Sequence, residues 1–267
     1  MKKNPKLHIF FIIILILSII LLFIKSPTNI HFPIILISLI AMMYMAIIIW
    51  FTKTQDDLSK ETLEFIYNFL KDKEEITSFD LNQSIDALEL YNEGILPYFD
   101  SSYSKDYITY NIDGVETFST NILLSLKQNE ELEDGMYRDI FKGQVFGIFR
   151  ESNLQTPIKI TSNEGIDYFN NLKKDYDDIK IETASIDLNN NYNVYTKNKI
   201  DAFTYLNPER IEILNDIYKK YGFVNITVTK ELVLIAIKSN KYILEEIKTL
   251  DNDYIEVISL LKTFKKL

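Results

Sequence analysis

Two apolar runs near the N-terminus decide how this chain is organised: residues 7–24 read LHIFFIIILILSIILLFI, and residues 32–51 read FPIILISLIAMMYMAIIIWF. As helices rising about 1.5 Å per residue they would span about 27 and 30 Å, which matches the hydrocarbon core of a bilayer. The connector between them contains Pro27 and Asn29 and is short enough to require an antiparallel hairpin. The sequence therefore predicts two transmembrane helices, with the lipid bilayer as the partner of residues 7–24 and 32–51.

The positive charges that flank the runs predict their orientation. The connector offers only Lys25, whereas the outer flanks carry Lys2, Lys3, Lys6, Lys53 and Lys60. The positive-inside rule then places both termini in the cytoplasm, so we expect a two-pass protein of a bacterial inner membrane. A cleaved signal peptide is the alternative interpretation of the first run. The length of that run, the lack of a small-x-small cleavage site and the second run directly after it all disfavour a signal peptide.

The part of the chain that follows the two runs is strongly acidic. Residues 1–51 hold four lysines and no acidic residue, so 25 of the 29 basic residues remain for residues 52–267, against 38 acidic ones. The resulting net charge near −13 repels nucleic-acid phosphates and anionic lipid headgroups alike. We therefore expect no nucleic acid among the partners, and we expect the apolar runs to hold this part at the membrane.

Residues 52–267 contain neither cysteine nor histidine, because the chain has no cysteine and its two histidines are His8 and His31. This composition excludes Ser-His-Asp and Cys-His catalysis, and zinc sites built on imidazole or thiolate, within these residues. Asp187-x-Asn189-x-Asn191 imitates the start of an EF-hand loop, but Tyr192 stands where the loop needs glycine. We expect an asparagine-rich turn there, and no metal or cofactor. The sequence assigns no catalytic residue.

A stalk helix and a hairpin are expected next along the chain. Residues 52–75 place apolar side chains on one stripe and charged side chains elsewhere, which is typical of an amphipathic helix. Asp113-Gly114 then separates the alternating runs 107–112 and 115–118, which is a strong hairpin signal. The sequence therefore predicts an anchor over 1–51, a stalk over 52–75 and a cytoplasmic domain over 76–267.

The run 141–149 is expected to be a strand although it contains Gly143 and Gly147. Glycine inside a strand marks a bulge or the close approach of another backbone. The run lacks the Lys-Ser/Thr ending of a phosphate-binding loop, and it lies in no long apolar segment that could form a membrane helix. We therefore interpret both glycines as structural.

The second half of the chain alternates strands with helices in no regular order. Asn207 as N-cap and Pro208 at the first helical position predict a helix that ends at Gly222. Residues 232–237 are apolar at every position, which indicates a central strand buried on both faces. Strands are further expected at 157–160, 179–182, 192–195 and 224–228, and helices at 82–93, 164–174, 242–250 and 254–264. The pattern predicts an α+β domain with a mixed, largely antiparallel sheet and packed helices.

Several of these stretches resemble a known family when they are taken in order. They are Phe141-x-Gly143-x-x-Phe146-Gly147-x-Phe149, Ile179 to Glu182, Tyr192 to Tyr195, Asp201-Ala202, Leu206-Asn207-Pro208, and the region of Ser119 with Asp106 before it. The chain is similar to a bacterial two-helix membrane family catalogued as a domain of unknown function, number three-one-three-seven. The resemblance implies the two-helix topology and the fold, and it implies no activity.

The chain departs from the family pattern at two positions. Family members often carry an arginine directly after the alanine that corresponds to Ala202, where this chain has Phe203. An aromatic residue is usual where Ile186 stands. If that arginine makes a shared ion pair or ligand contact in the family, this protein lacks the contact.

Three functions compete. The anchor, the acidic charge and the missing catalytic set favour a non-enzymatic domain that binds a protein partner or scaffolds a membrane complex. A carboxylate-based hydrolase at the membrane surface is the second hypothesis, since such chemistry needs only two nearby acids. Its candidates are Asp177-Asp178, Glu245-Glu246, Asp251 and Asp253. An accessory subunit of a membrane complex or transporter is the third, although neither apolar run contains Asp, Glu or Arg.

Overall fold

A computed structural model describes residues 61–82, 84–127, 137–163, 179–239, 242 and 248–267. The predicted transmembrane runs, the expected helix over 164–174 and the acidic pairs Asp177-Asp178 and Glu245-Glu246 lie outside these residues. Within the described ranges no helix is both long and apolar enough to cross a membrane. The chain divides into two compact units, Met1–Phe65 and Ile66–Leu267.

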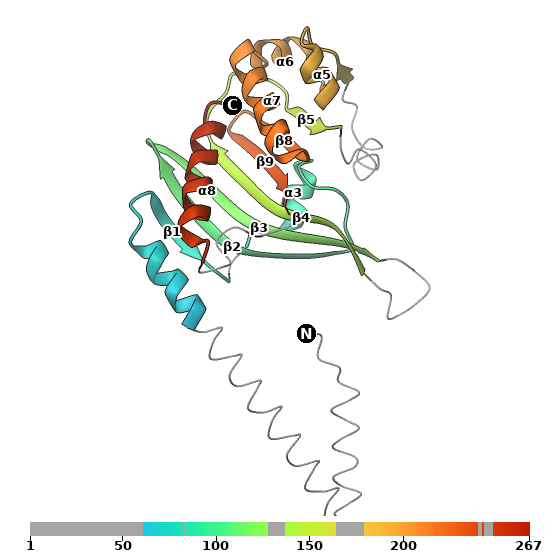
Figure 1. The fold of residues 1–267 in the computed structure, drawn as a ribbon. Coiled ribbons are helices and arrows are strands. Elements are labelled where there is room, and N and C mark those ends of the chain that lie inside the picture. The colour runs from blue at the N-terminus through green and yellow to red at the C-terminus, as the bar shows by residue number, and fades with distance from the viewer. Residues whose placement is uncertain (1–60, 83, 128–136, 164–178, 240–241, 243–247) are drawn as a thin grey trace, which may run out of the picture. The chain divides into compact units, whose positions relative to one another are not determined.

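The second unit is built on one sheet of nine strands in which every pairing is antiparallel (Figure 1). The strand order across the sheet is β1-β2-β3-β4-β9-β8-β5-β7-β6. The strands are β1 (Ile76–Asp80), β2 (Ser101–Ile112), β3 (Val115–Lys127), β4 (Tyr137–Phe149), β5 (Ile158–Ser162), β6 (Ile179–Ile181), β7 (Tyr192–Thr196), β8 (Val224–Val228) and β9 (Leu232–Lys238). The expected α+β class, with an antiparallel sheet and packed helices, is confirmed for the described residues, although no parallel pairing is found among them.

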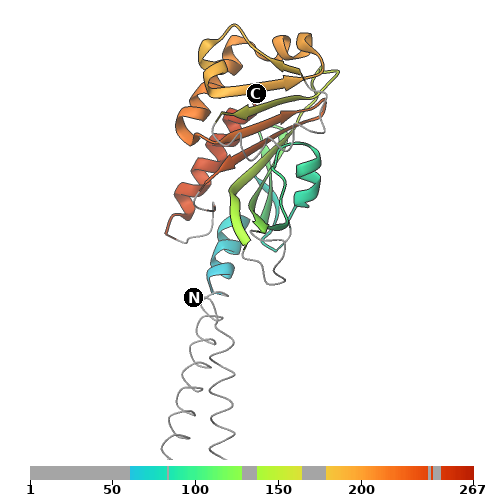
Figure 2. The ribbon, with the colours of Figure 1, turned by 90° about the vertical axis from the view of Figure 1, so that its right-hand side faces the viewer.

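Helices cover both faces of this sheet, as Figure 2 shows with α7 and α8 on one side and α3 on the other. Their bounds are α3 (Ala87–Asn92), α5 (Ile186–Asn191), α6 (Lys199–Tyr205), α7 (Pro208–Tyr221) and α8 (Leu250–Phe264). The larger core joins α7 and α8 to one face, and the smaller core joins α3 and the following residues Ile95 and Leu96 to the other. Asn207 caps α7 as predicted, because its side chain accepts from the backbone N–H of Arg210.

The central strand was predicted correctly. β9 is the fifth strand of the nine, and its residues alternate between the two cores, with Ile235 in the larger and Leu234 and Ala236 in the smaller. Burial on both faces leaves no position for a polar side chain, which is why residues 232–237 are apolar throughout.

Gly143 and Gly147 are confirmed as places of close approach. A Cβ on Gly143 would lie 2.0 Å from the carbonyl oxygen of Ile237 on β9. A Cβ on Gly147 would lie 2.0 Å from the ring of Phe118 on β3. Any larger residue at these positions would therefore collide with the neighbouring strand or with its side chain.

Local predictions failed where short polar motifs decide the structure. Residues 186–191 form α5 instead of the expected turn, because Ser185 accepts from the backbone N–H of Leu188 and Leu188 is fully buried. The helix expected over 82–93 begins only at Ala87, where the side chain of Asp86 caps it. β1 and α6 were not expected, and β2, β3 and β4 extend beyond the predicted runs.

Candidate functional site

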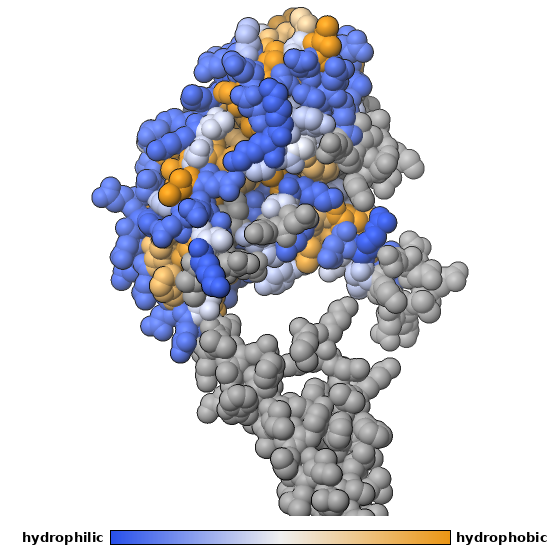
Figure 3. Space-filling view, in the orientation of Figure 1, coloured by the Kyte–Doolittle hydropathy of each residue, from blue (hydrophilic) through white to orange (hydrophobic). Residues whose placement is uncertain are grey.

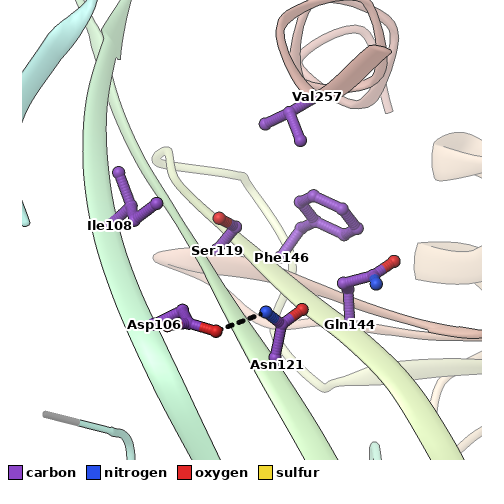
Figure 4. Close-up of a pocket in the computed structure, with 7 residues that line it drawn as sticks. All are labelled: Asp106, Ile108, Ser119, Asn121, Gln144, Phe146 and Val257. Carbon is purple, nitrogen blue, oxygen red and sulfur yellow. Dashed lines mark hydrogen bonds between the residues drawn. The ribbon is translucent and has the colours of Figure 1, made fainter. Parts of the chain in front are cut away.

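A small polar pocket opens under α8, on the face of the sheet that carries the larger core (Figure 4). Its volume is about 10 Å³, which is the room that one water molecule needs. The lining residues come from β2, β3, β4 and α8: Asp106, Ile108, Ser119, Asn121, Gln144, Phe146 and Val257. We call this site the polar pocket.

The register of three strands brings the polar residues of the pocket together. Asn121 on β3 pairs with Lys105 on β2 and with Gln144 on β4, so that all three side chains leave the same face of the sheet. The β2–β3 register shifts between Lys105 and Ile108, which inserts one extra residue into β2. Asp106 lies in this bulge with φ of 58°, a backbone conformation in which Asp is tolerated better than most residues. The bulge directs its carboxylate toward Asn121.

Hydrogen bonds hold this arrangement in place. The amide Nδ2 of Asn121 donates to Oδ2 of Asp106 at 2.8 Å, as drawn in Figure 4. The ammonium of Lys105 lies 3.6 Å from the same carboxylate oxygen. The hydroxyl of Thr120 donates to the backbone carbonyl of Lys105 at 3.0 Å and so ties β3 to the strand just before the bulge.

Two tyrosine hydroxyls lie under the same helix. Tyr110 and Ser119 share a buried hydrogen bond of 2.9 Å, and burial raises the pKa of Tyr110. Tyr254 on α8 donates to the Glu75 carboxylate, and this bond is the main reason that the pKa of Glu75 falls below its ordinary value. These two bonds give polar groups a partner on the face of the sheet that α8 covers.

The chemistry of the pocket suits an ordered water molecule, because its polar groups surround a space of that size. It offers one carboxylate, two amides and a hydroxyl, and it joins Asp106 to no second acid. Within the described ranges no three acidic, histidine or cysteine side chains come together as metal ligands would. Neither Asn121 nor Gln144 was predicted as a site residue, whereas Asp106 and the Ser119 region belong to the stretches that resemble the family.

Two of the candidate acids for a hydrolase are described, and each has a structural partner. Asp253 accepts from the hydroxyl of Thr249 at 2.9 Å in the first turn of α8. Asp251 lies 3.7 Å from the ammonium of Lys73. These contacts fix the beginning of α8 and give the two carboxylates separate partners.

A second candidate site lies at the far end of the sheet and combines apolar and basic side chains. Ile200 and Phe203 on α6 are 75% and 52% exposed, and Ile179 on β6 is 49% exposed. Lys197 and Lys199, also exposed, lie beside them. Figure 3 shows hydrophobic surface among hydrophilic surface at this end, where Figure 1 places α5 and α6. We call Ile179, Lys197, Lys199, Ile200 and Phe203 the α6 surface.

The chain connectivity holds the members of the α6 surface close together. Ile179 pairs with Thr196, the last residue of β7, and Lys197 follows Thr196 directly. Asn198 then caps α6 by accepting from the backbone N–H of Ile200 at 3.0 Å. Phe203 follows Ile200 by three positions, a spacing that places both side chains on one face of a helix.

Both departures from the family pattern lie on this part of the molecule. Phe203 belongs to the α6 surface, and Ile186 on α5 is 75% exposed. The neighbouring family residues are structural by contrast. Ala202 is fully buried, and Asp201 accepts from the backbone N–H groups of Gln155 and Thr156.

The comparisons with known proteins give a family match for part of the chain and no activity. Residues 139–267 match the family described as "Protein of unknown function (DUF3137)", which confirms the family resemblance for this part of the chain. No curated protein matches the sequence. Among solved structures, the crystal structure of the mycobacterial trehalose monomycolate transport factor A, TtfA, is similar with a TM-score of 0.40 and 10% identity, over 70% of this chain and 85% of that chain.

Proposed function

We propose that this protein is a two-pass inner-membrane protein whose cytoplasmic domain binds a protein partner and holds it at the membrane. The proposal joins the apolar runs 7–24 and 32–51 to the exposed apolar residues of the α6 surface. The runs have the length and composition of transmembrane helices. The α6 surface supplies what a partner-binding domain needs, an accessible apolar area on a folded unit.

The observation that carries the proposal is the exposure of Ile200 and Phe203 on one face of α6. Both side chains leave apolar area in water that burial against a partner would remove, at about 25 cal/mol per Å². Single exposed apolar residues are ordinary on a protein surface. Here a further one, Ile179, is exposed on β6, the strand that pairs with β7 just before α6. An aromatic and an aliphatic side chain exposed on one helix face are typical of the centre of a protein interface.

Crosslinking in intact membranes tests the partner. The full-length protein, tagged and at native expression, is crosslinked in cells, purified and analysed by mass spectrometry. We expect a protein partner to be recovered with the wild type and to be lost with Ile200→Glu/Phe203→Glu. The matched control is Ile255→Glu, because Ile255 on α8 is 64% exposed outside the α6 surface. Recovery of the bait alone from the wild type would overturn the proposal.

A topology reporter fused after residue 267 tests the cellular location separately. A cytoplasmic reporter signal is expected from the excess of lysines outside the connector. A signal from the exported side would place the domain in another compartment and would remove cytoplasmic proteins as partners.

A further inference from the structure

Two of the three arginines in this chain, Arg150 and Arg210, converge on the end of α8. Arg150 follows β4, and its Nη1 donates to the backbone carbonyl of Lys265 at 3.0 Å. Arg210 on α7 donates through Nε to the carbonyl of the next residue, Lys266, at 3.3 Å. Consecutive carbonyls thus accept from guanidinium groups of two different parts of the chain, which brings both positive charges to one place.

The side chain of Tyr205, the last residue of α6, lies against one of these guanidinium groups. The guanidinium carbon of Arg210 is 4.2 Å from the centroid of the Tyr205 ring, and Nη1 of Arg210 donates to the Tyr205 carbonyl at 2.9 Å. Burial raises the pKa of Tyr205 to about 12, although the charges of Arg210 and Arg150 both act to lower it. The hydroxyl of Tyr205 therefore lies in the field of both cations.

That hydroxyl has no hydrogen-bond partner within the described residues, and the side chain of Tyr205 is only 4% exposed. Nearly all buried polar groups in native proteins have a partner. The partner of this hydroxyl must therefore come from outside the described part of the chain.

The two guanidinium groups are not paired with acids. Within the described ranges neither forms an ion pair. Glu209 is the acid whose charge acts on Arg210, and its own side chain is exposed. Burial is the main cause that lowers the pKa of Arg210, and the like charge of Arg150 lowers it further. Residues 148–155 and 204–216 are all described, so no acid of unknown position adjoins either arginine in the sequence.

Binding the end of α8 accounts for only part of what these arginines offer. Cations stabilise the last carbonyls of a helix, and lysine can fill that role as well as arginine. A guanidinium has five N–H donors, of which Arg150 uses one and Arg210 two. Both side chains are half-buried, so the other donors remain within reach of a ligand. In a chain whose 29 basic residues include only three arginines, two together indicate a need for the planar guanidinium.

We propose that Arg150 and Arg210 bind a phosphate group, with the Tyr205 hydroxyl as a further donor. A phosphate monoester carries between one and two negative charges at neutral pH and three strong acceptor oxygens, which match two cations and a hydroxyl. Its oxygens also suit the bidentate geometry of guanidinium. A carboxylate has one charge and two oxygens, so it would satisfy fewer of these groups. The site is independent of the partner-binding function proposed above.

Equilibrium dialysis of the full-length protein in detergent against radiolabelled inorganic phosphate tests the site. We expect saturable binding that weakens about tenfold in Tyr205→Phe, because the anion loses one hydrogen bond. Arg150→Gln/Arg210→Gln should abolish it. Arg138→Gln, which removes the exposed third arginine on β4, is the matched control and should bind as the wild type does. Binding that is equal in the wild type and the double arginine variant would overturn the proposal.

Tyr205→Phe keeps the test decisive if the arginine variants fail to fold. The Tyr205 hydroxyl has no partner within the described residues, so its removal should not lower the unfolding midpoint in the absence of phosphate. A folded Tyr205→Phe variant with the affinity of the wild type would overturn the role of the hydroxyl.

A second arm distinguishes a soluble phosphate compound from a lipid headgroup. The protein is placed in nanodiscs of phosphatidylcholine with and without phosphatidic acid, whose headgroup is a phosphate monoester, and the unfolding midpoint is measured. A midpoint that rises with phosphatidic acid in the wild type and not in Tyr205→Phe, without binding of inorganic phosphate, would support the site and assign it to a lipid. Binding of inorganic phosphate without such a rise would support it and assign it to a soluble compound. No effect in either arm would overturn the proposal.

Discussion

The hydroxyl of Tyr254 donates to Oε2 of Glu75 at 2.5 Å, which links the C-terminal helix α8 to the residue directly before β1. The backbone of Glu75 is also bonded to the sheet, because its carbonyl accepts from the N–H of Asn111 on β2 at 2.8 Å. Lys73 lies over the rings of Phe69 and Tyr254, at 4.1 and 4.9 Å from their centroids. The chain entering the sheet is thus fastened to α8 by one hydrogen bond and one cation–π contact, both of them made to Tyr254.

The first prediction concerns the pKa of Glu75. Tyr254→Phe removes the hydrogen bond that stabilises the carboxylate, so the pKa of Glu75 should rise toward its ordinary value of 4.5. A titration of the Glu75 side-chain carbon by NMR measures the shift. Tyr98→Phe is the matched control, because Tyr98 makes a similar bond to Asp100 at 3.0 Å in an exposed position. An unchanged titration of Glu75 would contradict the assignment of Tyr254 as its main partner.

The same variant predicts how stability depends on pH. The pKa of Glu75 is lower in the folded protein than in the unfolded chain, so the bond stabilises the fold above the unfolded value near 4.5. That contribution is lost as the pH falls through the folded pKa. The free energy of unfolding of the wild type should therefore exceed that of Tyr254→Phe most clearly at neutral pH, with the difference shrinking below about pH 4.5. Denaturant unfolding at several pH values measures this, and a difference that grows toward acid would refute it.

The two single substitutions at the buried pair Tyr110 and Ser119 should lower the free energy of unfolding by unequal amounts. Ser119→Ala leaves the Tyr110 hydroxyl without a partner at a fully buried position, which should cost about 2 kcal/mol. Tyr110→Phe leaves the Ser119 hydroxyl beside the polar pocket, where a water molecule can replace the lost partner, so about 1 kcal/mol is expected. The double variant should cost less than the sum. Equal single costs would argue against water in the pocket.

Asp201 predicts a local change in hydrogen exchange. Its carboxylate holds the backbone N–H groups of Gln155 and Thr156, so Asp201→Ala should speed exchange at these two amides, with a cost of about 1–3 kcal/mol. Asp201→Asn keeps an oxygen acceptor, so the exchange rates of these two amides should lie between those of the wild type and those of Asp201→Ala. Asp187→Ala is the control, because Asp187 is an exposed acid in the first turn of the neighbouring helix α5. Exchange that rises throughout β7 as well would indicate general unfolding of the region instead.

Apolar runs and turn signals in the sequence predicted the strands and their order of burial, because such patterns follow directly from which residues are buried. Residues 232–237 are apolar at every position, and β9 lies in the centre of the sheet with both faces covered. Asp113-Gly114 joins β2 and β3 as expected, since both residues adopt the positive φ angles that a tight hairpin requires. Such a pattern is readable in the sequence because every residue of the strand or turn is subject to the same requirement.

Features that depend on a single side-chain contact could not be predicted in the same way. The polar pocket exists because a bulge at Asp106 turns its carboxylate toward Asn121, and the bulge is defined only by the pairing of two strands. The α6 surface depends on the β6–β7 pairing, which sets Ile179 beside Thr196 shortly before α6, although Ile179 and Ile200 are 21 positions apart in the sequence. α6 itself was missed because Asn198 and seven helical residues give little periodic signal.

The last prediction compares three glycines that differ in what a side chain would meet. Gly143→Ala would place Cβ 2.0 Å from the carbonyl oxygen of Ile237, and that carbonyl belongs to the central strand. A backbone held by strands on both sides cannot move away, so we expect a loss of about 3 kcal/mol or more, measured as the shift of the unfolding midpoint. Gly114→Ala meets no atom within 4 Å and should cost only the strain of its φ of 83°, about 1 kcal/mol.

Gly147→Ala tests crowding by a side chain, whereas Gly143→Ala tests crowding by a backbone. The Gly147 variant can still be measured if the Gly143 variant fails to fold. Its Cβ would meet the ring of Phe118 at 2.0 Å, and a side chain can be exchanged where a backbone cannot. We therefore expect Gly147→Ala to destabilise the domain and Gly147→Ala/Phe118→Leu to recover part of the loss, because the smaller side chain vacates the position of the ring edge. If the double variant were less stable than Gly147→Ala alone, the crowding at position 147 would have to come from the backbone of β3. Gly143 and Gly147 would then both be required because a neighbouring backbone lies close to them.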